Sequence, residues 1–237
     1  SGADVVHISP SHHFPTGTVT PASRRYELLG WAAKQPGRYI IEDEYDSEFR
    51  LVGNPIPALQ SIDASDKVIY MNTFSKSLSS TIRISYMVLP IPLMVRYNHV
   101  LSFYACTVSN FDQYTLTRFI QEGYLEKHIN RMRKFYRNSR DRILSCIRNH
   151  RLYPQVTIKE ENAGLHFLME VDTSYTDKEM VDRAAAAGIN ISSLSQYCHG
   201  KEQEDSHTLV INYSGIEEDI IEEACDRLLE SVVSLTT

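Results

Sequence analysis

Short apolar runs separated by helical patterns fill the first hundred residues of the chain. These runs are too continuous for strands with one solvent-exposed face, so they predict buried strands. They lie at residues 5–8, 39–41, 68–71 and 84–89. Thr20-Pro21 is typical of an N-cap followed by a first-turn proline, and Gly37 is predicted to close the helix that it starts. Strands that alternate with helices indicate a mostly parallel sheet, although the last two runs are joined by a loop alone and could pair differently.

The pattern becomes helical from residue 109 to about residue 150, and Gly123 is predicted to interrupt it. A smaller unit is predicted after Pro154. Its expected elements are a strand at 163–171, a helix from the capping box Thr176/Glu179, a strand at 207–213 and a helix from Ser214/Glu217. We therefore expect an α/β fold with a large domain at 1–108, connecting long helices at 109–150 and a small α+β domain at 151–237.

Composition and charge exclude several classes of protein. The 237 residues are 42% hydrophobic and 23% charged, which is typical of a globular protein. A net charge of −6 argues against a large nucleic-acid surface, so the basic residues between 127 and 142 are interpreted as a solvated helix face. No apolar run approaches the roughly 20 residues of a membrane span, and no secretory signal is evident. We expect a cytoplasmic protein without a membrane partner.

Cysteine and histidine spacing gives no sign of a metal site. The four cysteines, Cys106, Cys146, Cys198 and Cys225, are widely separated and contain no C-x-x-C pair. That spacing favours reduced, mostly packed thiols over a disulfide or zinc framework. The nine histidines also lack metal-ligand spacing, so no metal is expected.

One lysine in the segment NTFSKSLSSTIR (72–83) suggests chemistry. Lys76 lies just beyond a predicted strand, and Asp43 follows a neighbouring one. Functional residues of open α/β sheets gather at the carboxyl ends of strands. An amine and a carboxylate there suit pyridoxal 5′-phosphate (PLP), and Arg83 with a hydroxyl such as Ser75 would suit its phosphate. From spacing alone, a surface lysine and a helix-capping aspartate are the more ordinary interpretation.

Longer motifs around these residues carry a resemblance to a known family. The chain resembles the aminotransferase-like domain of MocR/GabR-type regulators of the GntR family, which implies a fold type I PLP fold with part of its large domain present. The motifs are PSHHFPTG (10–17), RRYELL (24–29), IIEDEYDSEFR (40–50), PALQSID (57–63), VIYMNTFSKSL (68–78), GYLEKHINRMRKFYRNSRD (123–141), AGLHF (163–167) and LSQY (194–197).

The resemblance implies roles for individual residues. Lys76 matches the lysine that forms the internal aldimine with PLP, and Asp43 matches the partner of the pyridine nitrogen. Tyr45 matches the tyrosine near the phenolic oxygen, and Arg83, with Ser75, matches the phosphate site. His12 matches a histidine near the cofactor and is equally consistent with loop packing. The alternatives are a buried tyrosine, a capping Ser75, and Arg83 paired with Asp63 or Asp66.

Two departures from the family pattern affect the expected ligand. The family has an arginine in its C-terminal strand that binds an amino-acid carboxylate, whereas the segment LVINY (209–213) has Val210 there. Valine cannot pair with a carboxylate, and Asn212 could donate one neutral hydrogen bond. The family also has upstream elements, a winged helix-turn-helix and part of the PLP pocket, that are not in this sequence. Ser1-Gly2-Ala3 resembles a cloning scar or a cut point, so we expect PLP to be absent or loosely held and an exposed apolar face to promote association.

The resemblance predicts a PLP-binding, effector-sensing and dimerisation domain of a transcription regulator. The expected partners are an amine or amino-acid-like effector, a second copy of the chain, and DNA only through a separate winged helix-turn-helix domain. We expect a sensor rather than an enzyme. The alternatives are a PLP-dependent aminotransferase acting on an amino acid and a scaffold without cofactor. The effector, the operator and the regulated genes stay open.

Overall fold

The computed structural model describes residues 2–54, 56–162, 164–198 and 205–234. The chain divides into two compact units. The first contains residues 1–13 and 18–132, and the second contains residues 14–17 and 133–237. The domain boundaries expected at 108 and 150 stay a prediction.

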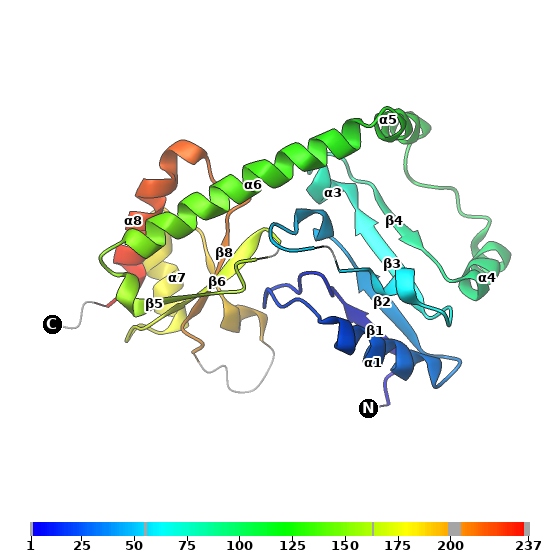
Figure 1. Ribbon diagram of the computed structural model, residues 1–237, viewed down its shortest axis with the longest axis horizontal. Coiled ribbons are helices and arrows are strands. Elements are labelled where there is room, and N and C mark those ends of the chain that lie inside the picture. Colours follow the sequence, from blue (N-terminus) through cyan, green and yellow to red (C-terminus); the bar gives the residue numbers. More distant parts are fainter. Residues whose placement is uncertain (1, 55, 163, 199–204, 235–237) are drawn as a thin grey trace. The chain divides into compact units, whose positions relative to one another are not determined.

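A four-stranded sheet forms the centre of the first unit (Figure 1). Its strands, in spatial order, are β1 (Val5–Ile8), β2 (Tyr39–Asp43), β3 (Val68–Thr73) and β4 (Ser85–Val88). The pairs β1–β2 and β2–β3 are parallel, and β3–β4 is antiparallel. The mostly parallel sheet expected from the sequence is therefore confirmed, as is the different direction of its last pair.

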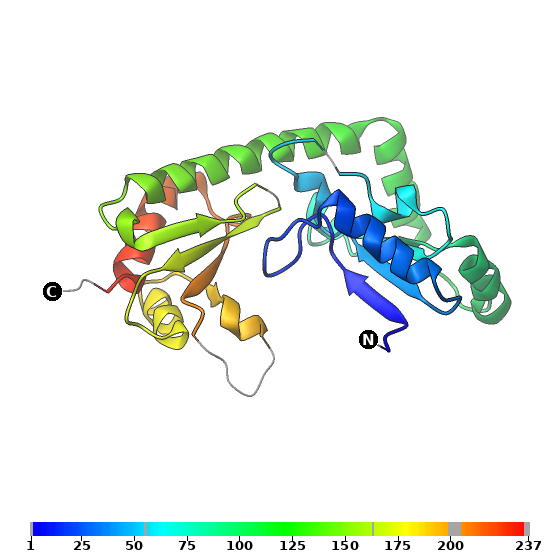
Figure 2. The ribbon, with the colours of Figure 1, turned by 60° about the horizontal axis from the view of Figure 1, so that its bottom comes forward.

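Helices flank this sheet, and the first of them packs against one of its faces (Figure 2). They are α1 (Ala22–Ala33), α2 (Leu59–Ile62), α3 (Phe74–Ser77), α4 (Ile91–Leu101) and α5 (Asn110–Gln121), with a 3-10 turn at Ser47–Phe49. The core of the face lies where Ala32 of α1 packs with Ile40, Leu59 and Val68. Each of these four side chains has at most 2% of its surface exposed. The expectation of buried strands therefore holds for positions of β2 and β3. It is wrong for β1, which has no buried residue, and for β4, whose four residues are all exposed.

Local signals place some helix ends correctly, and both ends of the first helix need correction. Pro21 occupies the N-cap position without a side-chain cap, and α1 ends at Ala33 rather than at Gly37. Ser109 caps α5 by accepting a hydrogen bond from the backbone of Asp112. Gly123 separates α5 from α6 (Tyr124–Asn149) with a φ of +73°, a conformation that favours glycine. The sequence reasoning missed α4.

The second unit has a smaller, wholly antiparallel sheet. Its strands, in spatial order, are β5 (Val156–Lys159), β6 (His166–Val171), β8 (Thr208–Asn212) and β7 (Ser192–Ser193). Its other elements are α7 (Asp177–Ala186), α8 (Ile221–Val232) and 3-10 turns at Tyr153–Gln155, Leu194–Tyr197 and Glu218–Ile220. The small α+β architecture is thus observed, although β5 and β7 were not anticipated.

Two expectations for the second unit concern element ends. The capping box of Thr176 and Glu179 is present at the start of α7. The helix expected from Ser214/Glu217 is wrong in its start, because α8 begins at Ile221 after a 3-10 turn and the Ser214 hydroxyl instead donates to Asn212 Oδ1. Residue 163, the expected start of β6, lies outside the described residues. Across the described part of the chain, no helix is long and apolar enough to cross a membrane.

Candidate functional site

The predicted site residues lie at the carboxyl ends of β2 and β3. Because these strands are parallel, their carboxyl ends share one edge of the sheet. Asp43 is the last residue of β2. Lys76 lies in α3, the single turn that directly follows β3, and its side chain is exposed. The structure therefore places the amine and the carboxylate on adjacent strand ends, as the sequence predicted.

The acidic segment Glu42–Asp46 divides into two rows because side chains alternate along extended backbone. Glu42, Glu44 and Asp46 are buried, whereas Asp43 and Tyr45 are half-buried. The buried carboxylates hold neighbouring loops. Glu42 accepts hydrogen bonds from the backbone N–H groups that begin α2, Glu44 accepts one from Ser11 Oγ at 2.7 Å, and Asp46 Oδ2 lies 2.8 Å from His12 Nδ1. These three carboxylates organise the loops that frame Asp43.

Burial without full compensation shifts the pKa of several groups here. Desolvation raises the pKa of Glu42, and it raises the pKa of Glu44 to about 7. Desolvation likewise lowers the pKa of Arg25, whose guanidinium is 1% exposed and lies 3.9 Å from Glu42 Oε1. Arg25 also donates to the carbonyls of Thr20 and Pro57. The charged cluster beneath the site is thus a structural support, which the sequence reasoning did not identify.

Asp43 has a neighbour that the sequence reasoning missed. His7 Nε2, on β1, lies 3.4 Å from Asp43 Oδ2. The register explains the contact, because His7 pairs with Ile41, and Asp43, two residues further along β2, faces the same side of the sheet as Ile41. The two strands were visible in the sequence as apolar runs, but the register that joins the two side chains was not. A protonated His7 would form an ion pair with Asp43.

Tyr45 and His12 are brought together by the loops after β2 and β1. Tyr45 Oη donates to the carbonyl of His12 at 3.0 Å and lies 3.3 Å from His12 Nδ1. Desolvation, followed by the nearby Asp46 and Asp43 carboxylates, raises the pKa of the phenol, so Tyr45 stays protonated and acts as a donor. The buried His12 also pairs with Asp46. This contact supports a packing role for His12, in addition to any role near a ligand.

Hydrogen bonds fold the segment around Lys76 back on itself. Thr73 Oγ1 accepts from the backbone of Ser75, and Phe74 N–H donates to the carbonyl of Ile84 at 2.9 Å. Ser75 Oγ donates to the carbonyl of Ile82 at 2.7 Å. The Ser75 hydroxyl proton is therefore already used, and a bound phosphate would have to displace this contact.

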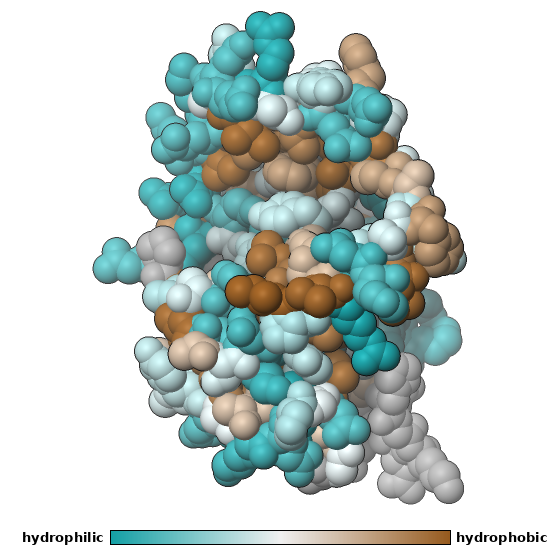
Figure 3. Space-filling view, turned by 90° about the vertical axis from the view of Figure 1, so that its right-hand side faces the viewer, coloured by the Kyte–Doolittle hydropathy of each residue, from teal (hydrophilic) through white to brown (hydrophobic). Residues whose placement is uncertain are grey.

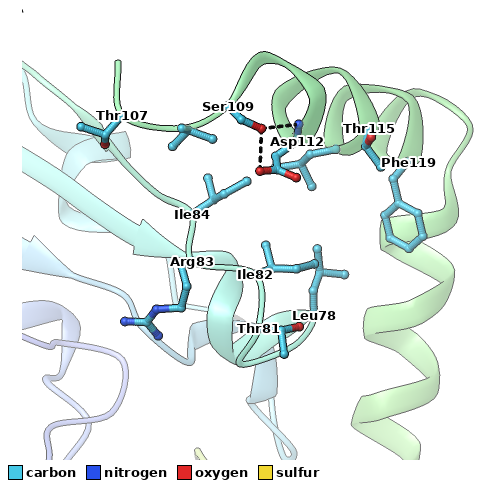
Figure 4. Close-up of a pocket in the computed structure, with 12 residues that line it drawn as sticks. Leu78, Thr81, Ile82, Arg83, Ile84, Thr107, Ser109, Asp112, Thr115 and Phe119 are labelled. Atoms are coloured by element: carbon cyan, nitrogen blue, oxygen red, sulfur yellow. Dashed lines mark hydrogen bonds between the residues drawn. The ribbon is translucent and has the colours of Figure 1, made fainter. Parts of the chain in front are cut away.

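Arg83 lies at the edge of a cavity of about 560 Å³ in the first unit. Figure 4 shows Leu78 and Ile82 pointing toward α5, whereas the Arg83 guanidinium extends to the opposite side of its segment. The Asp63 carboxylate accepts hydrogen bonds from the backbone N–H groups of Ser65, Lys67 and Val68. Its oxygens are therefore already used by hydrogen bonds within its own segment. Within the described residues neither Lys76 nor Arg83 has an ion pair, and both side chains are exposed.

Val210 stands where the family pattern has an arginine, and it is buried in the centre of β8. It pairs with Leu168 of β6 and Ser192 of β7. Asn212 Oδ1 accepts from both the backbone and the hydroxyl of Ser214, so its amide group is oriented by that turn. Among the described residues, no group of three or more His, Cys, Asp or Glu side chains is placed to hold a metal ion.

The groups present fit PLP in chemical type. An amine, a carboxylate, a protonated phenol and a guanidinium all lie at or near the carboxyl ends of β1–β3 within one unit. They match the aldehyde, the pyridine nitrogen, the phenolic oxygen and the phosphate of PLP respectively. The roles of Lys76, Asp43, Tyr45, Ser75, Arg83 and His12 stay predictions.

Comparison with known proteins agrees with this fold. Residues 4–228 match the family "Aminotransferase class I and II". The kynurenine aminotransferase of Pyrococcus horikoshii, whose crystal structure is a complex with PMP, superposes with a TM-score of 0.84 at 28% identity. That alignment covers 97% of this chain and 56% of the other. The expected fold type I architecture is confirmed.

Several curated relatives are regulators. The chain is 42% identical over 226 residues to the uncharacterized HTH-type transcriptional regulator YdeL of Bacillus subtilis, covering 95% of this chain and 48% of the relative. It is 32% identical over 232 residues to the probable rhizopine catabolism regulatory protein MocR of Rhizobium meliloti, covering 98% and 46% respectively. The chain thus spans about half the length of these relatives, and the expected resemblance to MocR-type regulators is confirmed. The extent of the family match shows that this chain belongs to the class I and II aminotransferase family.

Proposed function

We propose that the chain is the PLP-binding, effector-sensing and dimerisation domain of a GntR/MocR-family transcription regulator. The observation that carries the proposal is the position of Asp43 and Lys76 at the ends of adjacent strands, in a chain 42% identical to an HTH-type regulator. The regulator would act in the cytoplasm and contact DNA through a separate winged helix-turn-helix domain.

Each site residue has a role that its chemistry supports. PLP supplies an aldehyde and an electron-withdrawing ring. Lys76 would bind the aldehyde covalently, and the Asp43 carboxylate would favour the protonated pyridine nitrogen. Tyr45 would donate to the phenolic oxygen, because its raised pKa keeps its proton in place.

The phosphate would be bound by Arg83, whose guanidinium is exposed and has no ion pair among the described residues. Ser75 would contribute after releasing the Ile82 carbonyl. His12 would position Tyr45, since the two residues already contact one another.

The effector is proposed to be an amine or an amino-acid-like compound that differs from an ordinary α-amino acid. Val210 is buried in β8 and offers no cation to a carboxylate. An effector would instead shift the population between states of the protein that bias DNA binding.

An aminotransferase is the second candidate, supported by the 28% identity to the P. horikoshii enzyme. A sensor and an aminotransferase differ in whether they catalyse repeated turnovers. A steady-state transaminase assay with the PLP-loaded protein and a panel of amino donors should show no sustained product formation if the domain is a sensor. Multiple turnovers with any donor would favour the enzyme.

A PLP titration tests the site itself. Addition of PLP to the protein should produce a visible absorption band, and Lys76→Ala should abolish it. Lys134→Ala, which removes an exposed lysine on α6, is the matched control and should leave the band unchanged. Asp43→Asn should weaken binding and shift the band, because an amide does not stabilise the pyridinium charge. Persistence of the same band in Lys76→Ala would remove Lys76 from the site.

A further inference from the structure

A cavity of about 420 Å³ lies in the second unit. Its walls come from β8, α6 and α8, together with the segment between α7 and β7. The volume is within the range of about 300–1,000 Å³ that is typical of small-molecule sites. None of the six residues predicted for the PLP site is among the described residues that line it. The cavity is therefore a separate candidate for a ligand.

The lining of this cavity carries no charged side chain. Among the described residues that form it, none is Lys, Arg, His, Asp or Glu. The helix α6 contributes Ile143 and Ile147, and α8 contributes Ile221 and Leu228. A charged ligand would lose its hydration there without gaining a partner of opposite charge. The cavity therefore favours an uncharged molecule.

The apolar wall formed by α6 and α8 is already assembled in the structure. The isoleucine and leucine side chains that the two helices contribute all belong to the buried core. At the surface, Arg142 of α6 joins Glu222 of α8 through a bidentate pair, with Nε–Oε1 and Nη2–Oε2 distances of 2.8 and 2.7 Å. Because the wall is preformed, a ligand does not have to order it, and less binding free energy is lost.

A polar strip on the sheet gives the cavity a point of specificity. Asn212 lies two residues after Val210 on β8, and Ser192 of β7 pairs with Val210, so the three side chains share one face of the sheet. All three line the cavity. The Asn212 Oδ1 atom accepts two hydrogen bonds from Ser214, so the amide NH₂ is the group that Asn212 can present to a ligand. A carbonyl or amide oxygen on the ligand suits this donor.

Two aromatic rings lie at the mouth of the cavity. Phe14 and Tyr197 both line it, and they are 43% and 40% exposed respectively. Their ring centroids are 5.0 Å apart with an interplanar angle of 86°, which is an edge-to-face contact. A flat apolar molecule that enters the cavity covers these rings and removes them from water. The mouth therefore favours an aromatic ligand.

We propose that this cavity binds an uncharged, planar aromatic compound that carries an amide or carbonyl group. The apolar wall buries the ring, and the Asn212 amide donates a hydrogen bond to the carbonyl oxygen. An engineered apolar cavity of roughly 150 Å³ holds benzene. A volume of about 420 Å³ therefore has room for a bicyclic ring with a short side chain. The site does not depend on PLP and goes beyond the proposed function.

Two probes of the same shape test the charge argument. Indole-3-acetamide is uncharged, whereas indole-3-acetate carries a carboxylate at the same position. In isothermal titration calorimetry of the whole chain without PLP, the amide should bind saturably and at least about tenfold more tightly than the acetate. Equal affinities, tighter binding of the acetate, or no binding of the amide would overturn the proposal.

A filled cavity should lose its ligand. Ala224→Phe adds a ring to the lining from α8 and should weaken the binding of indole-3-acetamide by at least about tenfold. Ala185→Phe is the matched control, because Ala185 is exposed on α7 and is not among the described residues that line the cavity. Lys76→Ala should also leave the affinity unchanged, which distinguishes a failure of this site from a failure of the PLP site.

A cation in the lining should reverse the preference between the probes. Val210→Arg provides that cation, so indole-3-acetate should bind more tightly than indole-3-acetamide. Circular dichroism checks that each variant folds. Where Val210→Arg or Ala224→Phe does not fold, Asn212→Ala replaces it and should weaken binding of the amide by about three- to tenfold. An unchanged preference in folded Val210→Arg, or an unchanged affinity in folded Ala224→Phe or Asn212→Ala, would overturn the proposal.

Discussion

At the residue scale, neighbouring side chains of one type have very different surroundings. Arg24 and Arg25 are adjacent on α1, but Arg24 pairs with Glu27 at the surface and Arg25 is buried against Glu42 and two carbonyls. Removing one member of a buried pair leaves an uncompensated charge. Arg25→Ala should therefore lower the free energy of unfolding by about 3–5 kcal/mol, and Arg24→Ala by less than about 1 kcal/mol. Urea denaturation of both variants checks this, and equal effects would contradict the burial argument.

Glu44 gives a residue-scale prediction about pH. Its pKa in the folded protein is about 7, above the usual 4.5. The folded state thus holds this proton more tightly than the unfolded chain, so the contribution of Glu44 to stability is present at low pH and is lost as pH rises through 7. Glu44→Gln keeps an oxygen for the Ser11 hydroxyl and removes the buried charge.

We expect Glu44→Gln to be more stable than the wild type at pH 8 by on the order of 3 kcal/mol, and by under about 1 kcal/mol at pH 5. Urea denaturation at the two pH values measures the difference. Glu27→Gln, an exposed change on α1, is the control. A wild type as stable as Glu44→Gln at pH 8 would mean that Glu44 is not destabilising when ionised.

At the element scale, two glycines both have free space for a side chain but differ in backbone conformation. A Cβ added at Gly30 or at Gly123 would meet no atom within 4 Å. Gly30 lies inside α1, whereas Gly123 has a φ of +73° between α5 and α6. Gly30→Ala should raise the free energy of unfolding by about 0.5–1 kcal/mol, and Gly123→Ala should lower it by about 1–2 kcal/mol. Opposite signs in thermal and urea unfolding are the expected result, and a gain at Gly123 would contradict it.

Helix starts give a second prediction at this scale. Thr176 accepts from the backbone of Glu179, whose carboxylate returns a hydrogen bond to Thr176 N–H. Thr176→Ala should lower the free energy of unfolding by about 1 kcal/mol. Ser214 is the matched control, because it does not cap α8 and its hydroxyl contacts only the local turn at Asn212. Ser214→Ala should change stability by less than half as much in the same urea titration.

At the scale of the whole molecule, the first unit carries many exposed apolar side chains. The four residues of β4 are all exposed, and α4 and α5 contain no buried residue. Figure 3 views the side that carries these helices and shows hydrophobic side chains gathered on it. The largest exposures on α4 and α5 are those of Ile91, Val95, Phe111 and Tyr114, at 65–78%. Patches of this kind mark association surfaces.

We expect the chain to self-associate at tens of micromolar in sedimentation velocity. The double variant Val95→Glu and Phe111→Glu should shift the distribution toward the monomer, because it places charges on the apolar surface. Tyr26→Glu, at a 62% exposed tyrosine on α1, is the control and should leave the distribution unchanged. A strictly monomeric wild type would contradict the prediction that this apolar surface promotes association.

The pattern of the sequence by itself determined the features that depend on near neighbours. The parallel strands were visible as apolar runs, the break at Gly123 as a glycine within helical periodicity, and the start of α7 as a capping box. The carboxylate and the amine at the ends of β2 and β3 followed from the same pattern, because strand ends of a parallel sheet share an edge. The missed β5 is a four-residue strand whose conformation depends on its pairing with β6. The missed α4 has no buried residue, and the proline in its first turn was a local signal that the sequence analysis did not use.

Only the tertiary structure decided the contacts between distant residues. Strand register brought His7 to Asp43, and loop packing joined Tyr45 to His12. The loop after α3 brought the Ile82 carbonyl to the Ser75 hydroxyl, which donates a hydrogen bond to it. Such pairs arise because packing brings together side chains that no local spacing relates, and burial then sets which of them hold a charge or a proton.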